Sequence, residues 1–173
     1  MSSLRKTRKI FSKIYDEYVD KIYRFIFVKV NSQEVTEDLC SETFLRCWKI
    51  FKEDQNKIEN IQAFLYQIAR NLVTDHYREK GKTQIVSVDY VPITDPGTDL
   101  EEESRNNSDF NMVKLALNGL KENHQEVIIW YYVDDLSVSE IADLTSKSEG
   151  AVRVMIHRAL NNLKIELENK EEV

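Results

Sequence analysis

Both prolines of this 173-residue chain lie in one acidic stretch, residues 88–109, together with its only Pro-Gly pair. Proline and glycine interrupt regular secondary structure, and this stretch shows neither helical nor strand periodicity. Residues 89–110 contain seven acidic residues and one basic residue. A polar, strongly charged segment of this kind stays flexible. We therefore predict an acidic flexible linker over 88–109 that separates two domains, residues 1–87 and 110–173.

Both predicted domains show the apolar spacing of helices. The chain has only 4 Gly and 2 Pro, so helices can run with few interruptions. Thr36 is a suitable N-cap for the second helix, because Glu37 and Asp38 follow it in the first turn. The pattern predicts an all-α fold of two small helical bundles. The expected helices cover residues 11–30, 36–51, 61–79, 110–120, 125–132, 138–144 and 149–167, with a polar loop over 52–60.

Cysteine and histidine usage argues against disulfides, metal sites and enzymatic catalysis. Cys40 and Cys47 lie about 10.5 Å apart along a helix, too far for a disulfide, and no zinc-ligand spacing surrounds them. His76, His124 and His157 fall on different predicted helices without a nucleophile beside them. No stretch approaches the roughly 18–20 apolar residues of a membrane span. We expect a cytoplasmic protein without a membrane span, metal or cofactor, and not an enzyme.

The formal net charge of −6 at first disfavours nucleic-acid binding. The charge is distributed unevenly, however. Residues 1–88 contain 16 basic and 12 acidic residues, whereas residues 111–173 contain 7 basic and 11 acidic residues. The acidity is concentrated in the predicted linker and the last helices, so DNA binding remains compatible with the composition.

A helix-turn-helix is predicted near the C-terminus. Ser137 and Glu140 have the spacing of a capping box, and Ser148 can cap the helix that follows a short turn. In a helical projection, Ala151, Val154 and Arg158 face away from the apolar stripe, with Gly150, His157 and Asn161 on one flank and Met155 on the other. Small and apolar groups beside an arginine suit the major groove. An ordinary amphipathic hairpin fits the pattern equally well.

The C-terminal residues resemble the DNA-binding region of extracytoplasmic-function (ECF) sigma factors of bacterial RNA polymerase. The resemblance covers residues 120–142 and 148–163, and it implies that this region recognises the minus-thirty-five promoter element. The residues implied to contact that element are Ser148, Gly150, Ala151, Arg153, Val154, Met155, His157 and Arg158. The sequence departs from the usual family pattern at Lys121, Gln125, Ser146, Val154 and Met155. Two departures fall on the predicted reading face, so the usual promoter consensus does not follow from the resemblance.

Two polar stripes are predicted in the N-terminal domain. The helix expected from residue 36 places Leu45 among charged residues, which suits either a partner contact or a solitary exposed leucine. The helix expected from residue 61 has a polar stripe flanked by Tyr66 and Tyr77. Such a stripe suits single-stranded DNA, which needs phosphate contacts and aromatic faces. A solvated helix face is the alternative. The stripe consists of Gln67, Arg70, Asn71, Thr74 and Arg78.

The N-terminal residues resemble the core-binding and promoter-melting domain of the same sigma-factor family. The resemblance rests on residues 14–26, 36–49 and 63–72, which contain Glu-Asp-Leu, Glu-Thr-Phe-Leu-Arg and Ile-Ala-Arg-Asn segments in the family's order. It implies docking on the polymerase clamp helices through Asp38, Glu42, Leu45 and Lys49. It also implies that the loop over residues 52–62 holds a base flipped from the minus-ten element. The implied contacts to that element are Lys57, Asn60, Gln62, Phe64, Arg70, Asn71, Arg78, Lys80 and Lys82.

Together the two resemblances imply a sigma factor that binds core RNA polymerase, directs it to specific promoters and promotes strand opening. The implied partners are the clamp helices and flap of core polymerase, duplex and melted promoter DNA, and an anti-sigma factor. In this family the acidic linker, here around residues 101–103, tends to occupy polymerase's nucleic-acid channels.

A linker of 22 residues averages only ~25 Å end to end and reaches at most ~75 Å. Promoter elements lie about 35–70 Å apart. The free chain should therefore read both elements poorly. The alternatives are a helix-turn-helix regulator that acts without polymerase and an anti-sigma-like interaction protein.

Overall fold

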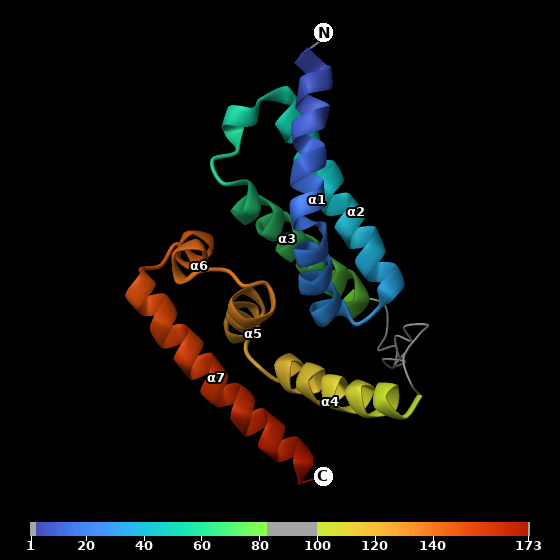
Figure 1. Cartoon of the computed structure of the whole chain (residues 1–173), viewed down its shortest axis with the longest axis vertical. Coiled ribbons are helices and arrows are strands. Elements are labelled where there is room, and N and C mark those ends of the chain that lie inside the picture. Colours follow the sequence, from blue (N-terminus) through green and yellow to red (C-terminus); the bar gives the residue numbers. More distant parts are fainter. Residues whose placement is uncertain (1–2, 83–99, 173) are drawn as a thin grey trace. The chain divides into compact units, whose positions relative to one another are not determined.

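The computed structural model describes residues 3–82 and 100–172, and all the regular structure in these two ranges is helical. The predicted all-α fold is confirmed. The chain forms two compact units, unit 1 (Met1–Asp89) and unit 2 (Tyr90–Val173). The helices shown in Figure 1 are α1 (Ser3–Val30), α2 (Gln33–Glu53), α3 (Ile61–Lys82), α4 (Leu100–Asn118), α5 (Glu122–Ile128), α6 (Val138–Thr145) and α7 (Glu149–Glu171).

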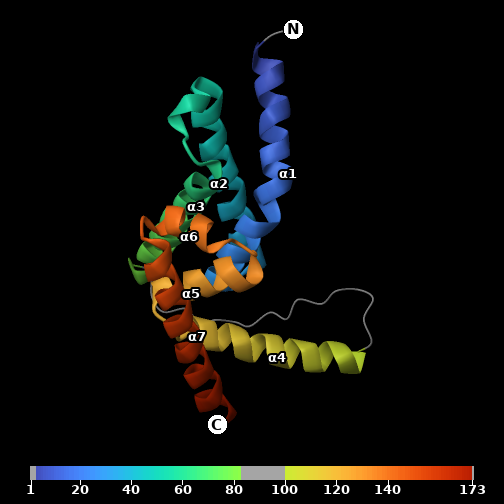
Figure 2. The ribbon, with the colours of Figure 1, turned by 60° about the vertical axis from the view of Figure 1, so that its left-hand side comes forward.

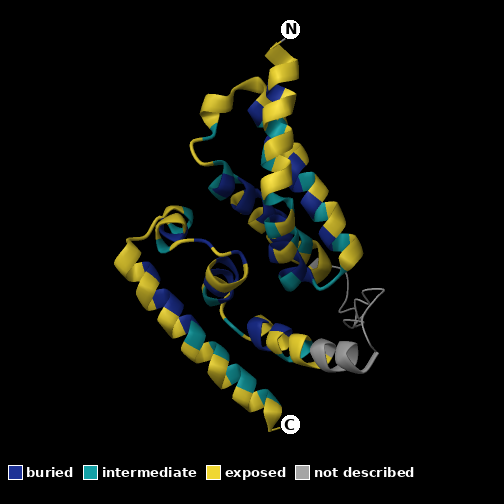
Figure 3. Cartoon of the chain, in the orientation of Figure 1, coloured by how far each residue is buried: buried dark blue, intermediate teal, exposed yellow. Residues whose placement is uncertain are grey.

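Unit 1 is a bundle in which α1, α2 and α3 pack against one another. Its centre is apolar, and Figure 3 shows the buried residues gathered on the sides of the helices that face each other. Phe25 packs edge-on against Tyr66 with ring centroids 5.2 Å apart. Cys40 and Cys47 are free thiols within this core. Burial raises the pKa of each to about 11, so both stay protonated and unreactive at neutral pH.

The helix starts in unit 1 differ from the prediction. Helix α1 begins at Ser3 rather than at residue 11. Helix α2 begins at Gln33, because the Oγ of Ser32 accepts a hydrogen bond from the Val35 amide at 3.3 Å. The predicted N-cap, Thr36, is therefore wrong. It lies fully buried inside the helix, and its hydroxyl donates to the carbonyl of Ser32 at 2.6 Å.

The segment between α2 and α3 forms a short 3-10 turn at Gln55–Lys57 within the predicted loop. The Asp54 carboxylate starts this turn by accepting from the Asn56 amide at 2.9 Å. Asn60 then caps α3, because its Oδ1 accepts from the Ala63 amide at 3.0 Å. The predicted start of α3 at residue 61 is confirmed.

Unit 2 is built around α7, which packs against α4, α5 and α6. Val127, Ile129, Ile141, Val152 and Ala159 are fully buried at its centre. The segment expected as one helix over 125–132 instead ends its α-helical part at Ile128 and continues as a π turn, Ile129–Val133. This wider turn leaves Tyr131 and Tyr132 exposed while Trp130 stays buried.

The helix expected over 110–120 begins ten residues earlier, at Leu100. Residues 100–109 are therefore helical, although the sequence pattern predicted no helix for this part of 88–109; the flexibility of the linker stays a prediction. The rest of the predicted linker lies outside the described residues.

No helix in the described part of the chain combines the length and the apolar character needed to cross a bilayer.

Candidate polymerase and nucleic-acid interfaces

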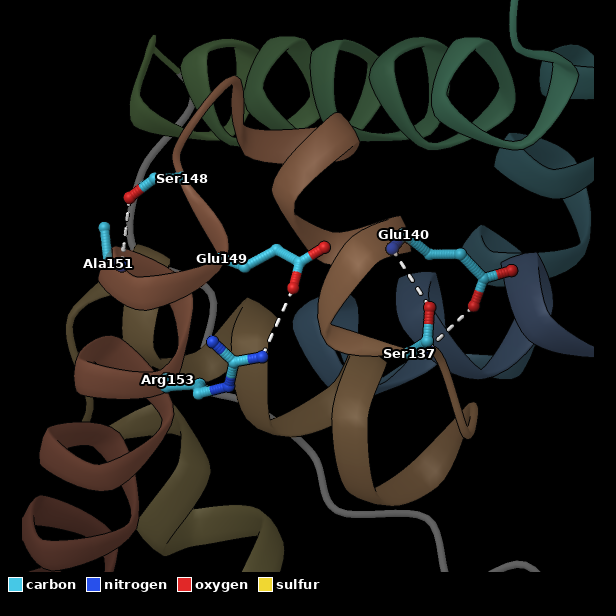
Figure 4. A network of polar contacts seen from close by, with 6 residues as sticks. All are labelled: Ser137, Glu140, Ser148, Glu149, Ala151 and Arg153. Carbon is cyan, nitrogen blue, oxygen red and sulfur yellow. Dashed lines mark hydrogen bonds and ion pairs between the residues drawn. The ribbon is translucent and has the colours of Figure 1, made fainter.

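Helix α6 begins with the predicted capping box. The Oγ of Ser137 accepts from the Glu140 amide at 3.1 Å, and the Glu140 carboxylate accepts from the Ser137 amide at 2.7 Å (Figure 4). These bonds satisfy two amides that the first turn would otherwise leave unpaired. The capping box therefore sets where α6 begins.

A tight turn joins α6 to α7. Ser146 adopts a left-handed conformation with φ 54°, which ends α6. The Oγ of Ser148 then accepts from the Ala151 amide at 3.2 Å and starts α7 (Figure 4). Helix, turn and longer helix thus follow one another as in a helix-turn-helix.

The exposed face of α7 contains most of the residues predicted to read the minus-thirty-five element. Val154 is 50% exposed, and Gly150, Ala151, His157 and Arg158 are exposed as well. Arg153 is exposed and pairs with Glu149 at 3.2 Å, one turn earlier (Figure 4). This face combines small, apolar and cationic side chains near the N-terminus of the helix.

Met155 does not lie on this face, so its predicted place on the reading surface is wrong. It is 9% exposed and belongs to the core of unit 2. The reason is its position three residues after the fully buried Val152, which puts both side chains on the same side of α7.

The predicted polymerase-binding stripe is accessible on α2. Asp38, Leu45 and Lys49 are exposed, and Leu45 is 48% exposed among these charged neighbours. Glu42 is half-buried and accepts from Arg46 at 2.6 Å, so its charge is partly neutralised. The stripe offers one apolar side chain flanked by carboxylates and an ammonium group.

The predicted strand-binding residues of α3 and the loop before it are mostly exposed. Lys57 and Asn60 lie on the loop, while Phe64 is half-buried at the start of α3. Farther along α3 the exposed residues are Arg70, Asn71, Arg78 and Lys80. Lys82 is the last residue of α3, and its side chain lies outside the described part.

Two side chains of α3 depart from the predicted arrangement. Gln62 is 7% exposed, so the prediction that it contacts DNA is wrong. It lies one turn before the buried Tyr66 and shares the inward side of the helix. Tyr66 packs against Phe25 rather than at the edge of the polar stripe. Tyr77 remains at that edge, and its hydroxyl donates to the backbone carbonyl of Lys29.

The positive charge along the exposed side of α3 comes from arginine and lysine side chains rather than from His76. Burial lowers the pKa of His76, the neighbouring Lys80 lowers it further, and Glu79 opposes both effects. The His76 imidazole is therefore neutral at pH 7. Arg70, Arg78 and Lys80 are the exposed residues that provide this positive charge.

A groove between α1 and α2 was not predicted from the sequence. It has a volume of about 380 Å³ and is lined by Arg8, Phe11, Ser12, Tyr15 and Trp48. Within residues 3–82 and 100–172, no group of three or more His, Cys, Asp or Glu side chains is arranged to hold a metal ion.

Family models match the chain in two places. Residues 14–83 match Sigma-70 region 2, and residues 110–163 match Sigma-70, region 4. The ECF RNA polymerase sigma factor BldN of Streptomyces coelicolor is 32% identical over 160 residues, which cover 88% of this chain and 58% of BldN. The ECF RNA polymerase sigma factor SigM of Bacillus subtilis is 27% identical over 157 residues, which cover 88% of this chain and 91% of SigM.

Solved structures share the fold. The sigma factor RpoE from Bartonella quintana, crystallised with the anti-sigma factor NepR, has a TM-score of 0.65 and 24% identity, covering 92% of this chain and 98% of RpoE. CnrH, solved with the cytosolic domain of CnrY, has a TM-score of 0.64 and 20% identity, covering 94% of this chain and 90% of CnrH. With both sigma regions present in order and curated ECF relatives along most of its length, the chain belongs to the extracytoplasmic-function branch of the sigma-70 family.

Proposed function

We propose that this chain acts as an ECF sigma factor, which binds core RNA polymerase, directs it to specific promoters and promotes strand opening. The observation that carries the proposal is the ordered pair of sigma regions on two compact units, each with an accessible polar face. In this role the chain is a binding subunit rather than an enzyme, and it works in the cytoplasm with polymerase.

The exposed stripe of α2 is the proposed contact with the polymerase clamp helices. Leu45 would enter an apolar pocket, and Asp38 and Lys49 would fix the orientation through the charges around it. Glu42 would take part only through the oxygen that Arg46 leaves accessible. The proposed contact of unit 2 is the polymerase flap.

The loop before α3, together with the exposed stripe of α3, is the proposed contact with the minus-ten element. Extrusion of a base costs a few kcal/mol of unstacking, which contacts in the loop must offset. Lys57 and Asn60 are the accessible polar residues of this loop, and Phe64 offers a partly exposed ring. Arg70, Asn71, Arg78, Lys80 and Lys82 would hold the strand and the upstream phosphates.

The exposed face of α7 is the proposed contact with the minus-thirty-five element. Arg158 can pair with guanine, while Ala151 and Val154 suit thymine methyl groups. Ser148, Gly150, Arg153 and His157 complete the set, and Met155 is removed from it because of its burial. An anti-sigma factor is a further proposed partner, of the class named in the RpoE complex.

Leu45→Asp tests the proposed function at its first step. A charge placed in a desolvated contact should weaken core polymerase binding by about 2 kcal/mol, roughly 30-fold in affinity. Leu4→Asp is the matched control, because Leu4 is 46% exposed in the same unit but lies outside the stripe. Titration of labelled core polymerase measures both variants. Equal affinities for parent, variant and control would refute the assignment of the stripe.

A further inference from the structure

The first part of α1 presents a cationic surface that none of the three proposed interfaces uses. It lies before residue 14, where the match to Sigma-70 region 2 begins. The first acidic residue of the chain is Asp16. We define the α1 cationic face as the five exposed residues Arg5, Lys6, Arg8, Lys9 and Lys13.

These five side chains share one side of the helix. At about 100° per residue they span about 160° of its circumference, opposite the side on which Thr7, Phe11 and Ile14 face inward. Figure 3 shows this end of α1 exposed apart from its inward side. Within the described residues none of the five forms an ion pair, so their charges are available to an external partner.

The face is held rigidly against the rest of unit 1. The Phe11 ring packs on Trp48 and Phe51, with ring centroids 5.1 Å and 5.4 Å apart. The Gln55 amide donates to the Thr7 hydroxyl at 3.4 Å and so joins this end of α1 to the loop that precedes α3. Figures 1 and 2 both show the start of α1 and this loop at the same end of unit 1.

The position of the face extends the proposed path of the DNA. Upstream contacts lie at the C-terminal end of α3, and the proposed pocket for the flipped base lies in the loop at the other end. The two ends are about 33 Å apart along the 22 residues of α3. A strand that runs from Arg78 toward Lys57 and continues past the loop reaches the end of unit 1 where the cationic face lies.

We propose that the α1 cationic face binds phosphates of the promoter DNA immediately downstream of the minus-ten element. This inference rests on the proposed function, because it needs the strand to be held by α3 and the loop. Lysine and arginine side chains bind the DNA backbone without reading its sequence. The face therefore stabilises the open complex at any promoter that the other two interfaces select.

The packing of α1 against α2 favours nucleic acid over a membrane surface as the partner of the cationic face. A helix that lies on a membrane needs a broad apolar side opposite its cations. Here that side is occupied by α2, on which Phe11 packs, and Thr7 is buried as well. Leu4 and Ile10 are the exposed large apolar residues of this segment.

The test compares two triple variants in holoenzyme assembled with core polymerase. The α1 variant combines Arg5→Gln, Lys9→Gln and Lys13→Gln. It removes the three charges in the middle of the face, and glutamine keeps the helix propensity high. The control variant, with Lys121→Gln, Lys164→Gln and Lys170→Gln, removes the same charge from unit 2 at positions outside the residues proposed to contact DNA or the clamp helices. Affinity is measured between about 50 and 200 mM salt on two forked promoter templates. One template extends past the minus-ten element, and the other ends at its last base.

On the template that extends past the minus-ten element (the long template), we expect the promoter affinity of the α1 variant to depend less steeply on salt than that of the parent. Each phosphate contact contributes about 0.7–0.9 to the slope of log affinity against log salt, so three lost contacts reduce the slope by about 2. Over the fourfold salt range the parent should lose roughly 16-fold more affinity than the variant. The difference should vanish on the short template, and the unit 2 variant should match the parent on both. Lys9→Gln alone should lower the slope by about 0.7.

Three results would overturn the inference. The first is a salt slope of the α1 variant that differs from that of the parent equally on both templates, or that does not differ on either template. The second is a loss of affinity for core polymerase in the absence of DNA, which would make the face a protein contact. The third is binding to phosphatidylglycerol vesicles that depends on these residues, with unchanged promoter affinity. A parent chain that fails to bind core polymerase at all would instead refute the proposed function.

Discussion

Met155 and Val154 are neighbours on α7, but Met155 is buried and Val154 is exposed. Substituting each of them therefore tests the proposed reading face. Met155 is 9% exposed and Val154 is 50% exposed. We expect Met155→Ala to lower the free energy of unfolding of unit 2 by about 2–3 kcal/mol, because a buried side chain is lost. Val154→Ala should change it by less than about 0.5 kcal/mol and should instead alter the preferred minus-thirty-five sequence. Urea unfolding followed by Trp130 fluorescence in a Trp48→Phe background checks the stability, and a binding-site selection checks the preferred sequence. A stable Met155→Ala variant with an altered motif would contradict the assignment.

Lys114 gives unit 2 a pH-dependent stability. Its side chain is buried, and burial lowers its pKa from 10.5 to about 8. Between these values the unfolded chain keeps a proton that the folded chain has lost. The free energy of unfolding therefore gains a contribution that rises with pH in this window.

Lys114→Met should lack that contribution. The free energy of unfolding of the variant minus that of the parent should decrease by about 2–3 kcal/mol between pH 8 and pH 10.5. Urea unfolding at several pH values, in a Trp48→Phe background so that Trp130 reports on unit 2, measures this difference. A difference that stays constant with pH would show that Lys114 does not cause the effect.

At the scale of single helices, the capping box of α6 is the clearest local determinant. Ser137→Ala removes the acceptor for the Glu140 amide and should lower the free energy of unfolding of unit 2 by about 1 kcal/mol. Ser139→Ala is the matched control, since Ser139 is exposed inside the same helix and alanine is the best helix former. Thermal unfolding compares the two variants. Equal stabilities would mean that the capping box does not hold α6 in place.

At the scale of the whole molecule, the charge distribution predicts dependence on polymerase. The helix-turn-helix lies in a segment with more acidic than basic residues, so it attracts the DNA backbone weakly by itself. We expect the free chain to bind duplex promoter DNA at least about 100-fold more weakly than the holoenzyme at the same salt concentration. Fluorescence anisotropy of a labelled duplex measures both affinities. Tight, sequence-specific binding by the chain alone would support a regulator that acts without polymerase.

The sequence by itself determined the helical class, the two sigma regions and several helix ends. These features depend on local patterns, that is, on residues that lie close together in the sequence. The capping box of Ser137 and Glu140 satisfies amides within its own turn, and Ser148 caps α7 in the same way. The start of α3 and most exposed residues of the candidate interfaces follow from the same three-four spacing.

Only the tertiary structure decided which residues at the margins of the apolar stripes are covered. Gln62, Tyr66 and Met155 all lie at such margins, and the neighbouring helices bury all three. It also decided that α1 continues to Ser3, that Phe11 packs on α2, and that Thr7, on the inward side of the same segment, is joined to the loop before α3. A helical projection gives the direction of a side chain but not the width of the surface that a partner helix covers. That width depends on contacts between residues far apart in the sequence, such as Phe11 with Phe51 and Phe25 with Tyr66.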